Sequence, residues 1–161
     1  MKKLIRMGLL IACLAIQTPA FAEDWKGEPD GIGFDFGGLV GLGIVDSSSG
    51  VATIGTLSRK IISKGFVPDI SNSVSVEGQF GPIFIPQHTA WFYSAHLRWD
   101  FNKSPAWTFY GLGGFGGNIM SSRVEIFPRL GAGAIWKVDQ LVWLRGEVSH
   151  ELTAVGVTIP F

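Results

Sequence analysis

The stretch Glu151-Leu152-Thr153-Ala154-Val155-Gly156-Val157-Thr158-Ile159-Pro160-Phe161 decides the fold of this chain. Large apolar residues recur in it at every second position, at Val155, Val157, Ile159 and Phe161. Successive side chains of a strand point to opposite faces, so these residues share one face. The other face carries small or polar residues. The stretch therefore predicts a strand with one apolar face over 152–161.

A second stretch, 91–101, shows the same alternation more strongly. One face carries Trp91, Tyr93, Ala95, Leu97, Trp99 and Phe101, and the other carries Phe92, Ser94, His96, Arg98 and Asp100. The first face has aromatic rings at both ends and smaller apolar side chains between them. Aromatic rings favour the two interfaces of a membrane, so this strand is expected to cross a bilayer.

Weaker alternation predicts six further strands, at 32–44, 51–58, 73–80, 107–115, 123–138 and 141–149. Turns are expected at 46–50, 102–105, 139–140 and 150–151, and loops at 81–87 and 116–122. Residues 59–71 are either a long connection or a continuation of the second strand. An open sheet edge cannot face hydrocarbon, where unpaired backbone groups are costly. The expected fold class is therefore all-β: a closed, antiparallel, up-and-down transmembrane β-barrel of about eight strands.

The N-terminal residues have the composition of a secretory signal. Lys2, Lys3 and Arg6 precede the apolar run 7–16, and Ala20-Phe21-Ala22 forms a cleavage site. We expect a signal peptide over 1–22 and a single barrel domain over 23–161. The alternative is a lipidated Cys13 after Leu10-Ile11-Ala12.

Charge and composition argue against several partners and cofactors. Three of the 13 Lys and Arg residues lie in the expected signal, which leaves 10 against 13 Asp and Glu. No basic surface suggests nucleic acid. The three histidines are not spaced as metal ligands, so we expect neither a metal nor another cofactor.

Polar side chains of the alternating strands should point into the barrel. The expected lumen network comprises Asp35, Glu77, Gln79, His96, Arg98, Asp100, Arg145 and Glu147. An eight-stranded barrel is filled by its own side chains, and buried charges must be paired. A structural ion-pair network that plugs the lumen is the favoured interpretation, and a proton or ion path is the alternative.

Ser149, His150 and Glu151 are the candidate catalytic residues of the alternative interpretation. A hydroxyl, an imidazole and a carboxylate are the groups of an acyl ester hydrolase. Consecutive residues point to opposite faces of a regular strand, so a bulge would be needed to bring Ser149 to His150. Ser94 and His96 have the better spacing but are expected in the lumen. Whether the chain is an enzyme stays uncertain, with no catalysis as the favoured interpretation.

The signal, the terminal strand ending in Phe161 and the strands 91–101 and 142–149 resemble small eight-stranded outer-membrane barrels of Gram-negative bacteria, of the OmpA and OmpX transmembrane type. Pro160 departs from the usual pattern of that family. The resemblance implies export to the outer membrane, contact with lipid and lipopolysaccharide, and a monomer. It also implies that the assembly machinery reads the terminal strand. The aromatic residues expected at the membrane interfaces are Trp91, Tyr93, Trp99, Phe101, Trp136 and Phe161.

Two functional classes follow from this resemblance. The first is a barrel with a structural or surface-interaction role and no catalysis. The second is an outer-membrane enzyme that hydrolyses acyl esters of lipid A at the extracellular rim. A soluble, exported, lipocalin-like barrel is a third possibility, which the Trp and Phe pattern of 91–101 disfavours.

Overall fold

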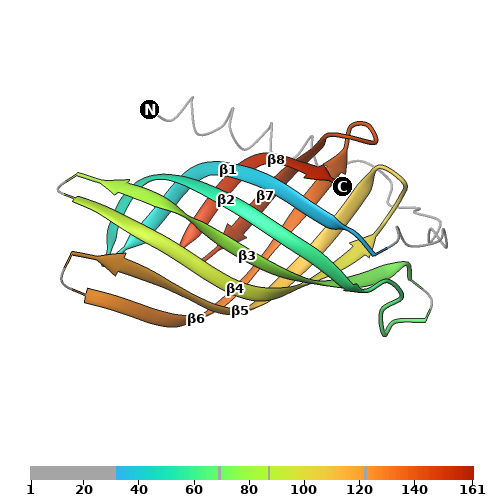
Figure 1. The fold of residues 1–161 in the computed structure, drawn as a ribbon, viewed down its shortest axis with the longest axis horizontal. Helices are drawn as coiled ribbons and strands as arrows, with labels where there is room; N and C mark the ends of the chain where they lie inside the picture. Colours follow the sequence, from blue (N-terminus) through green and yellow to red (C-terminus); the bar gives the residue numbers. More distant parts are fainter. Residues whose placement is uncertain (1–31, 69, 87, 122) are drawn as a thin grey trace, which may run out of the picture.

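Eight antiparallel strands close into a barrel in the computed structural model, which describes residues 32–68, 70–86, 88–121 and 123–161 (Figure 1). The strands are β1 (Phe34–Val45), β2 (Ser48–Ile62), β3 (Asn72–Ile85), β4 (His88–Asn102), β5 (Trp107–Met120), β6 (Arg123–Lys137), β7 (Trp143–Ser149) and β8 (Leu152–Pro160). The expected fold class is confirmed. The signal peptide expected over 1–22 lies outside the described residues. Within the described part of the chain, no helix has the length and apolar character to cross a membrane.

The C-terminal strand closes the barrel against the first strand. The pairing of β1 with β8 runs from Asp35 opposite Pro160 to Gly43 opposite Leu152. The backbone N–H of Phe161 donates to the carbonyl of Phe34 at 2.9 Å. The C-terminal stretch 152–161 therefore pairs the backbone groups on the edge of β1 that β2 does not cover, and this pairing closes the sheet.

The connections differ between the two ends of the barrel. At one end, here called the turn end, the strands are separated only by 46–47, 86–87, 121–122 and 150–151. At the other, here called the C-terminal end, the longer connections 63–71, 103–106 and 138–142 lie with the end of β8 (Figure 1). Asp46 and Ser47 both have positive φ, at 47° and 65°. Two such residues form the tight hairpin turn whose twist matches the strands.

Several strand boundaries differ from the expectation. The turn expected over 46–50 is confined to Asp46 and Ser47, and β2 extends to Ile62, which shortens the connection that follows. The loops expected over 81–87 and 116–122 are mostly strand, since β3 continues through Pro82 to Ile85 and β5 continues to Met120. β7 begins at Trp143, two residues later than expected.

Pro82 lies inside β3 because only one side of the strand loses its pairing there. On the β4 side the register continues, with Pro82 opposite Trp91. On the β2 side the regular pairs stop at Ile83 and resume at Phe80. Proline has no N–H for the ladder. The interruption is local, and the sequence signal for a loop was therefore wrong.

The outer face of the barrel is apolar along its height, with aromatic rings gathered toward the ends. At the C-terminal end Trp107 stacks on Trp136 with ring centroids 5.8 Å apart, and Phe34 stacks on Phe161 at 5.9 Å. Toward the turn end, Trp91 stacks on Phe80. Of the expected interface aromatics, Trp91, Trp136 and Phe161 are exposed, while Tyr93, Trp99 and Phe101 are half-buried. An apolar belt between aromatic girdles is the surface that a bilayer requires.

The interior has two layers instead of the single charged network that the sequence predicted. Toward the turn end lies an apolar layer formed by Leu39, Val45, Ala52, Ile54, Ile83, Ile85, Ala90, Phe92, Leu152 and Ala154. A charged layer fills the middle and extends toward the C-terminal end, beside a small apolar cluster of Tyr110, Leu112 and Ile135. The apolar layer was missed because β2 and β3 carry apolar side chains on both faces near the turn end, which hides the alternation.

Candidate functional site

The charged layer is centred on Glu77 of β3, whose side chain is fully buried. Arg145 of β7 donates to both of its carboxylate oxygens, from Nη1 at 2.9 Å and from Nη2 at 2.7 Å. Arg98 of β4 donates to Glu77 from Nη1 at 2.6 Å. Two arginines from opposite sides of the lumen thus share one carboxylate, and bidentate geometry of this kind is the strong form of such a pair.

Arg98 also joins the network to the C-terminal end. Its Nε donates to Asp100 Oδ1 at 2.9 Å, and its Nη2 donates to Asp35 Oδ2 at 3.1 Å. Asp35 comes from β1, so this arginine bridges β1, β3 and β4. The second carboxylate oxygen of Asp35 is buried and has no hydrogen-bond partner among the described residues.

Glu147 of β7 forms the other side of the network. It accepts a hydrogen bond from Arg145 Nη2 at 2.5 Å and one from Arg129 of β6. The Tyr110 hydroxyl donates to it at 3.1 Å, and the Gln79 amide nitrogen lies within hydrogen-bond range. Arg129 continues to Glu151, with Nε and Oε1 2.6 Å apart.

The predicted lumen residues therefore all lie inside the barrel. Asp35, Glu77, Gln79, His96, Arg98, Asp100, Arg145 and Glu147 are each buried. His96 lies beside Glu77, with Nε2 and Oε1 3.4 Å apart, and its Nδ1 is 3.3 Å from Ser94 Oγ. Ser94 and His96 thus face the lumen and belong to the network.

Sequence reasoning missed Arg129 and Tyr110. Arg129 is fully buried, and its guanidinium lies 5.0 Å from the Phe92 ring centroid, where the charged layer meets the apolar layer. Tyr110 stacks beneath Arg145, with the guanidinium carbon 4.9 Å from the ring centroid. Arg129 precedes the lipid-facing Leu130 in the strand, so the alternation placed it on the inward face. The adjacent Pro128 obscured this pattern, because proline is unusual inside a strand.

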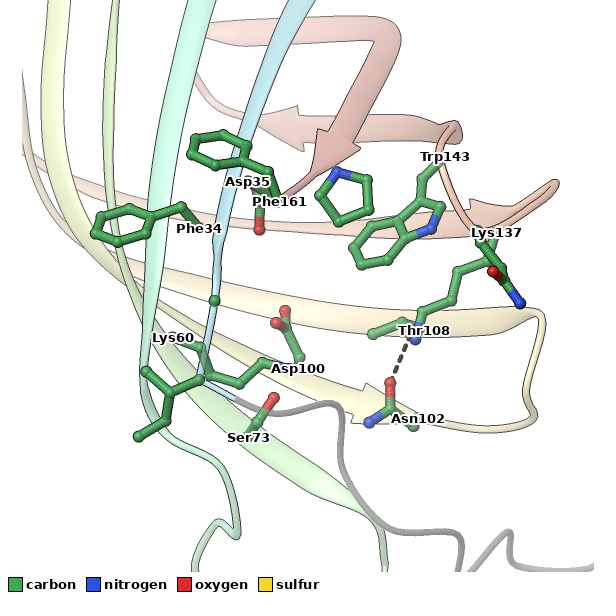
Figure 2. A pocket seen from close by; sticks show the side chains of 14 residues that line it. Phe34, Asp35, Lys60, Ser73, Asp100, Asn102, Thr108, Lys137, Trp143 and Phe161 are labelled. Carbon is green, nitrogen blue, oxygen red and sulfur yellow. Dashed lines mark hydrogen bonds between the residues drawn. The ribbon is translucent and has the colours of Figure 1, made fainter.

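At the C-terminal end the lumen opens into a vestibule of about 360 Å³. Figure 2 shows Asp35 and Asp100 together with Lys60 and Lys137 around this space. Polar side chains line it further, including Thr108, whose hydroxyl donates to Asn102 Oδ1 at 2.6 Å. Because Arg98 pairs with both Asp35 and Asp100, the charged layer borders the vestibule.

The residues considered for catalysis are only partly brought together. His150 Nδ1 lies 2.8 Å from Glu151 Oε2, and His150 is exposed while Glu151 is buried. A carboxylate on Nδ1 is how a catalytic imidazole is oriented. The Ser149 hydroxyl, however, donates to the backbone carbonyl of Leu152 at 3.2 Å. The Ser149 hydroxyl is therefore bonded elsewhere, and the alternative of a catalytic triad is incomplete in this structure.

Three arginines and five carboxylates from six segments of the chain cross-link the barrel interior. The carboxylates are Asp35, Glu77, Asp100, Glu147 and Glu151, and the arginines are Arg98, Arg129 and Arg145. Among the residues that the structure describes, no three His, Cys, Asp or Glu side chains are placed to hold a metal ion. The arrangement can hold strands together across the lumen and fill it.

No protein-family model and no curated protein matches the sequence. The crystal structure of Ail, the attachment invasion locus protein of Yersinia pestis, matches with a TM-score of 0.52 and 12% identity, over 81% of this chain and 97% of that one. The backbone structure of the Yersinia pestis outer membrane protein Ail in a phospholipid bilayer nanodisc matches with a TM-score of 0.54 and 14% identity, over 82% and 100%. The fold is thus that of a small eight-stranded outer-membrane barrel, as the sequence resemblance implied.

Proposed function

We propose that this chain is an integral outer-membrane barrel whose lumen is plugged and whose role is structural, without catalysis. The observation that carries the proposal is the pairing of Arg98 and Arg145 across Glu77, backed by a separate apolar layer. A conducting pore needs water in its lumen, whereas cross-linked ion pairs and packed apolar side chains exclude it.

The lengths of the connections favour a structural role over recognition by long surface loops. We place the end where β1 begins and β8 ends on the periplasmic side, so the turn end would face outside. At that end two residues separate each pair of connected strands, and the turn formed by Asp46 and Ser47 is tight. Contact with lipid and lipopolysaccharide would then come from the apolar belt, and insertion would use the strand that ends in Phe161.

Planar-bilayer recordings of the purified, folded protein test the plug. Folding and insertion are checked first, by heat-modifiable migration in gels and by recovery in outer-membrane fractions. We expect no discrete conductance steps from the inserted protein. Regular single-channel steps from folded monomer would overturn the plugged lumen, and recovery of the protein in soluble periplasmic extract would overturn the membrane location.

A second candidate, hydrolysis of lipid A acyl esters, is favoured by one observation. The carboxylate of Glu151 lies on Nδ1 of the exposed His150. The geometry of Ser149 counts against it, as described above. Mass spectrometry of lipid A after overexpression tests this candidate. The candidate is supported if the wild-type protein removes an acyl chain from lipid A and the His150→Ala variant does not. An unchanged lipid A mass with the wild-type protein would exclude the candidate.

A further inference from the structure

Positive charge outside the lumen gathers at one end of the barrel. Among the described residues, the Lys and Arg side chains outside the charged layer are Arg59, Lys60, Lys64, Lys103 and Lys137 at the C-terminal end and Arg123 at the turn end. Lys60 and Lys137 line the vestibule. Arg59, Lys64 and Lys103 are exposed on the outside, and we call these three the basic rim.

The carboxylates near the two ends leave this difference in place. At the turn end, Arg123 pairs with Glu125 and lies 3.5 Å from Asp46, so its charge is compensated. At the C-terminal end, the exposed Asp139 caps its own turn, accepting backbone N–H donors from Leu141 and Val142 at 2.7 Å each. Within the described ranges, the outer surface at the C-terminal end is therefore the basic one.

The aromatic girdle fixes the depth of the basic rim in a membrane. The Arg59 guanidinium carbon lies 5.2 Å from the ring centroid of Phe34, which is exposed on the lipid-facing side. Phe66, in the same β2–β3 connection as Lys64, packs edge-on against Trp99. Aromatic rings settle at the headgroup boundary, and long basic side chains extend from there toward the phosphates. The basic rim thus lies at headgroup depth.

We propose that the basic rim binds the headgroups of anionic phospholipids in the leaflet at the C-terminal end. Guanidinium and ammonium groups pair with phosphate, and basic residues near a membrane surface favour anionic over zwitterionic lipid. The three residues come from β2, the β2–β3 connection and the β4–β5 turn, so they are spread along the circumference. Such spacing fits several boundary lipids better than one deeply bound molecule. This interaction goes beyond the proposed function, which requires only a bilayer.

Fluorescence quenching in reconstituted nanodiscs tests the proposal. The folded full-length protein is placed in phosphatidylcholine discs with 30% phosphatidylglycerol, and one lipid or the other carries brominated acyl chains. Trp99 packs on Phe66 of the β2–β3 connection, and the Trp107 carbonyl accepts the backbone N–H of Lys103 while its ring stacks on Trp136, so these rings report the lipid at the basic rim once Trp91 at the turn end is replaced by Phe. We expect phosphatidylglycerol to be enriched about fivefold beside each basic residue, and this local preference to be lost when that residue is neutralised. The preference should also fall at high salt.

The decisive comparison is between Arg59→Gln/Lys64→Gln/Lys103→Gln and the control Arg123→Gln. The triple variant should lose the preference, and the control should keep it. Quenching of the wild-type protein by the two brominated lipids in the 30:70 proportion of the bulk bilayer would overturn the proposal, as would a preference that disappears only in the control. Soluble glycerol phosphate that abolishes the preference at millimolar concentration would assign the residues to free phosphate instead. A protein that fails to insert in any disc would contradict the proposed function itself.

Discussion

The hydroxyl of Tyr110 lies directly over Gly133, so that a methyl group on that glycine would stand 2.3 Å from the phenolic oxygen. The close approach lets the ring of a β5 residue cross β6 and reach β7. There the hydroxyl contacts the Gly146 carbonyl at 3.2 Å and accepts a hydrogen bond from Arg145 Nε at 2.8 Å. Tyr110 can thus reach its place in the network because Gly133 has no side chain.

The first prediction concerns Gly133→Ala. The methyl group would stand 2.3 Å from both the Tyr110 hydroxyl and the Gly146 carbonyl, so it must displace Tyr110 and push on β7, which overpacks the lumen and breaks the hydrogen bonds of Tyr110 with Arg145 and Glu147. We expect a loss of about 2–3 kcal/mol in the free energy of unfolding, measured by urea titration in micelles. Gly111→Ala is the matched control, because nothing lies within 4 Å of the added methyl there. Equal losses in the two variants would contradict the role of the close approach.

The second prediction concerns the central pair. Glu77→Leu leaves Arg98 and Arg145 without the carboxylate that they share, so about 3–5 kcal/mol of stability should be lost. In that variant Arg145 keeps only Glu147 as a carboxylate partner, so adding Arg145→Met removes an arginine that has lost its bidentate partner and should restore part of this loss. If the two residues are not coupled, the stability losses of Glu77→Leu and Arg145→Met will simply add in the double variant. An additive loss would therefore contradict the prediction.

Sequence patterns predicted the barrel because a membrane-crossing strand must keep one face apolar for its whole length. The strand around Trp91 and Trp99 and the strand ending in Phe161 show this alternation, and each defines its own inward face. Inward charges such as Arg98 and Glu147 followed from that pattern. The pairing partners did not follow, because Arg98 and Asp35 are brought together only when the barrel closes.

The missed features have a physical reason. The alternation of apolar and polar residues fades where the lumen is also apolar, as at Ile54 and Ile83. Pro82 predicts a loop from the sequence, although a strand that loses regular pairing on only one side can hold a proline. Arg129 could be predicted to face the lumen only if β6 was assumed to continue through Pro128. Its partners Glu147 and Glu151 come from β7 and the β7–β8 turn, so the sequence around Arg129 did not indicate them.

The third prediction tests which face meets lipid. Leu97 lies on the outer face of β4 and is 51% exposed. Leu97→Arg should lower the free energy of unfolding in bilayers by about 2–4 kcal/mol, because a charge near the bilayer midplane is desolvated. Thr89→Arg, on the same face near the turn end, should lose only about 0–1 kcal/mol. If Leu97→Arg were neutral in bilayers, that face would be in water.

The fourth prediction concerns the turn between β1 and β2. Ser47 has φ of 65°, a conformation that costs a residue with a side chain about 1–2 kcal/mol. Glycine adopts it without that penalty, although its freer unfolded chain offsets part of the gain. Ser47→Gly should therefore raise the free energy of unfolding by about 0.5–1 kcal/mol. The control is Ser48→Gly, one residue further on and inside β2, where glycine should instead lower stability by about 0.5–1 kcal/mol. Urea titrations of both variants measure the free energy of unfolding. A change of the same sign at the two positions would mean that the left-handed conformation of Ser47 does not cost stability.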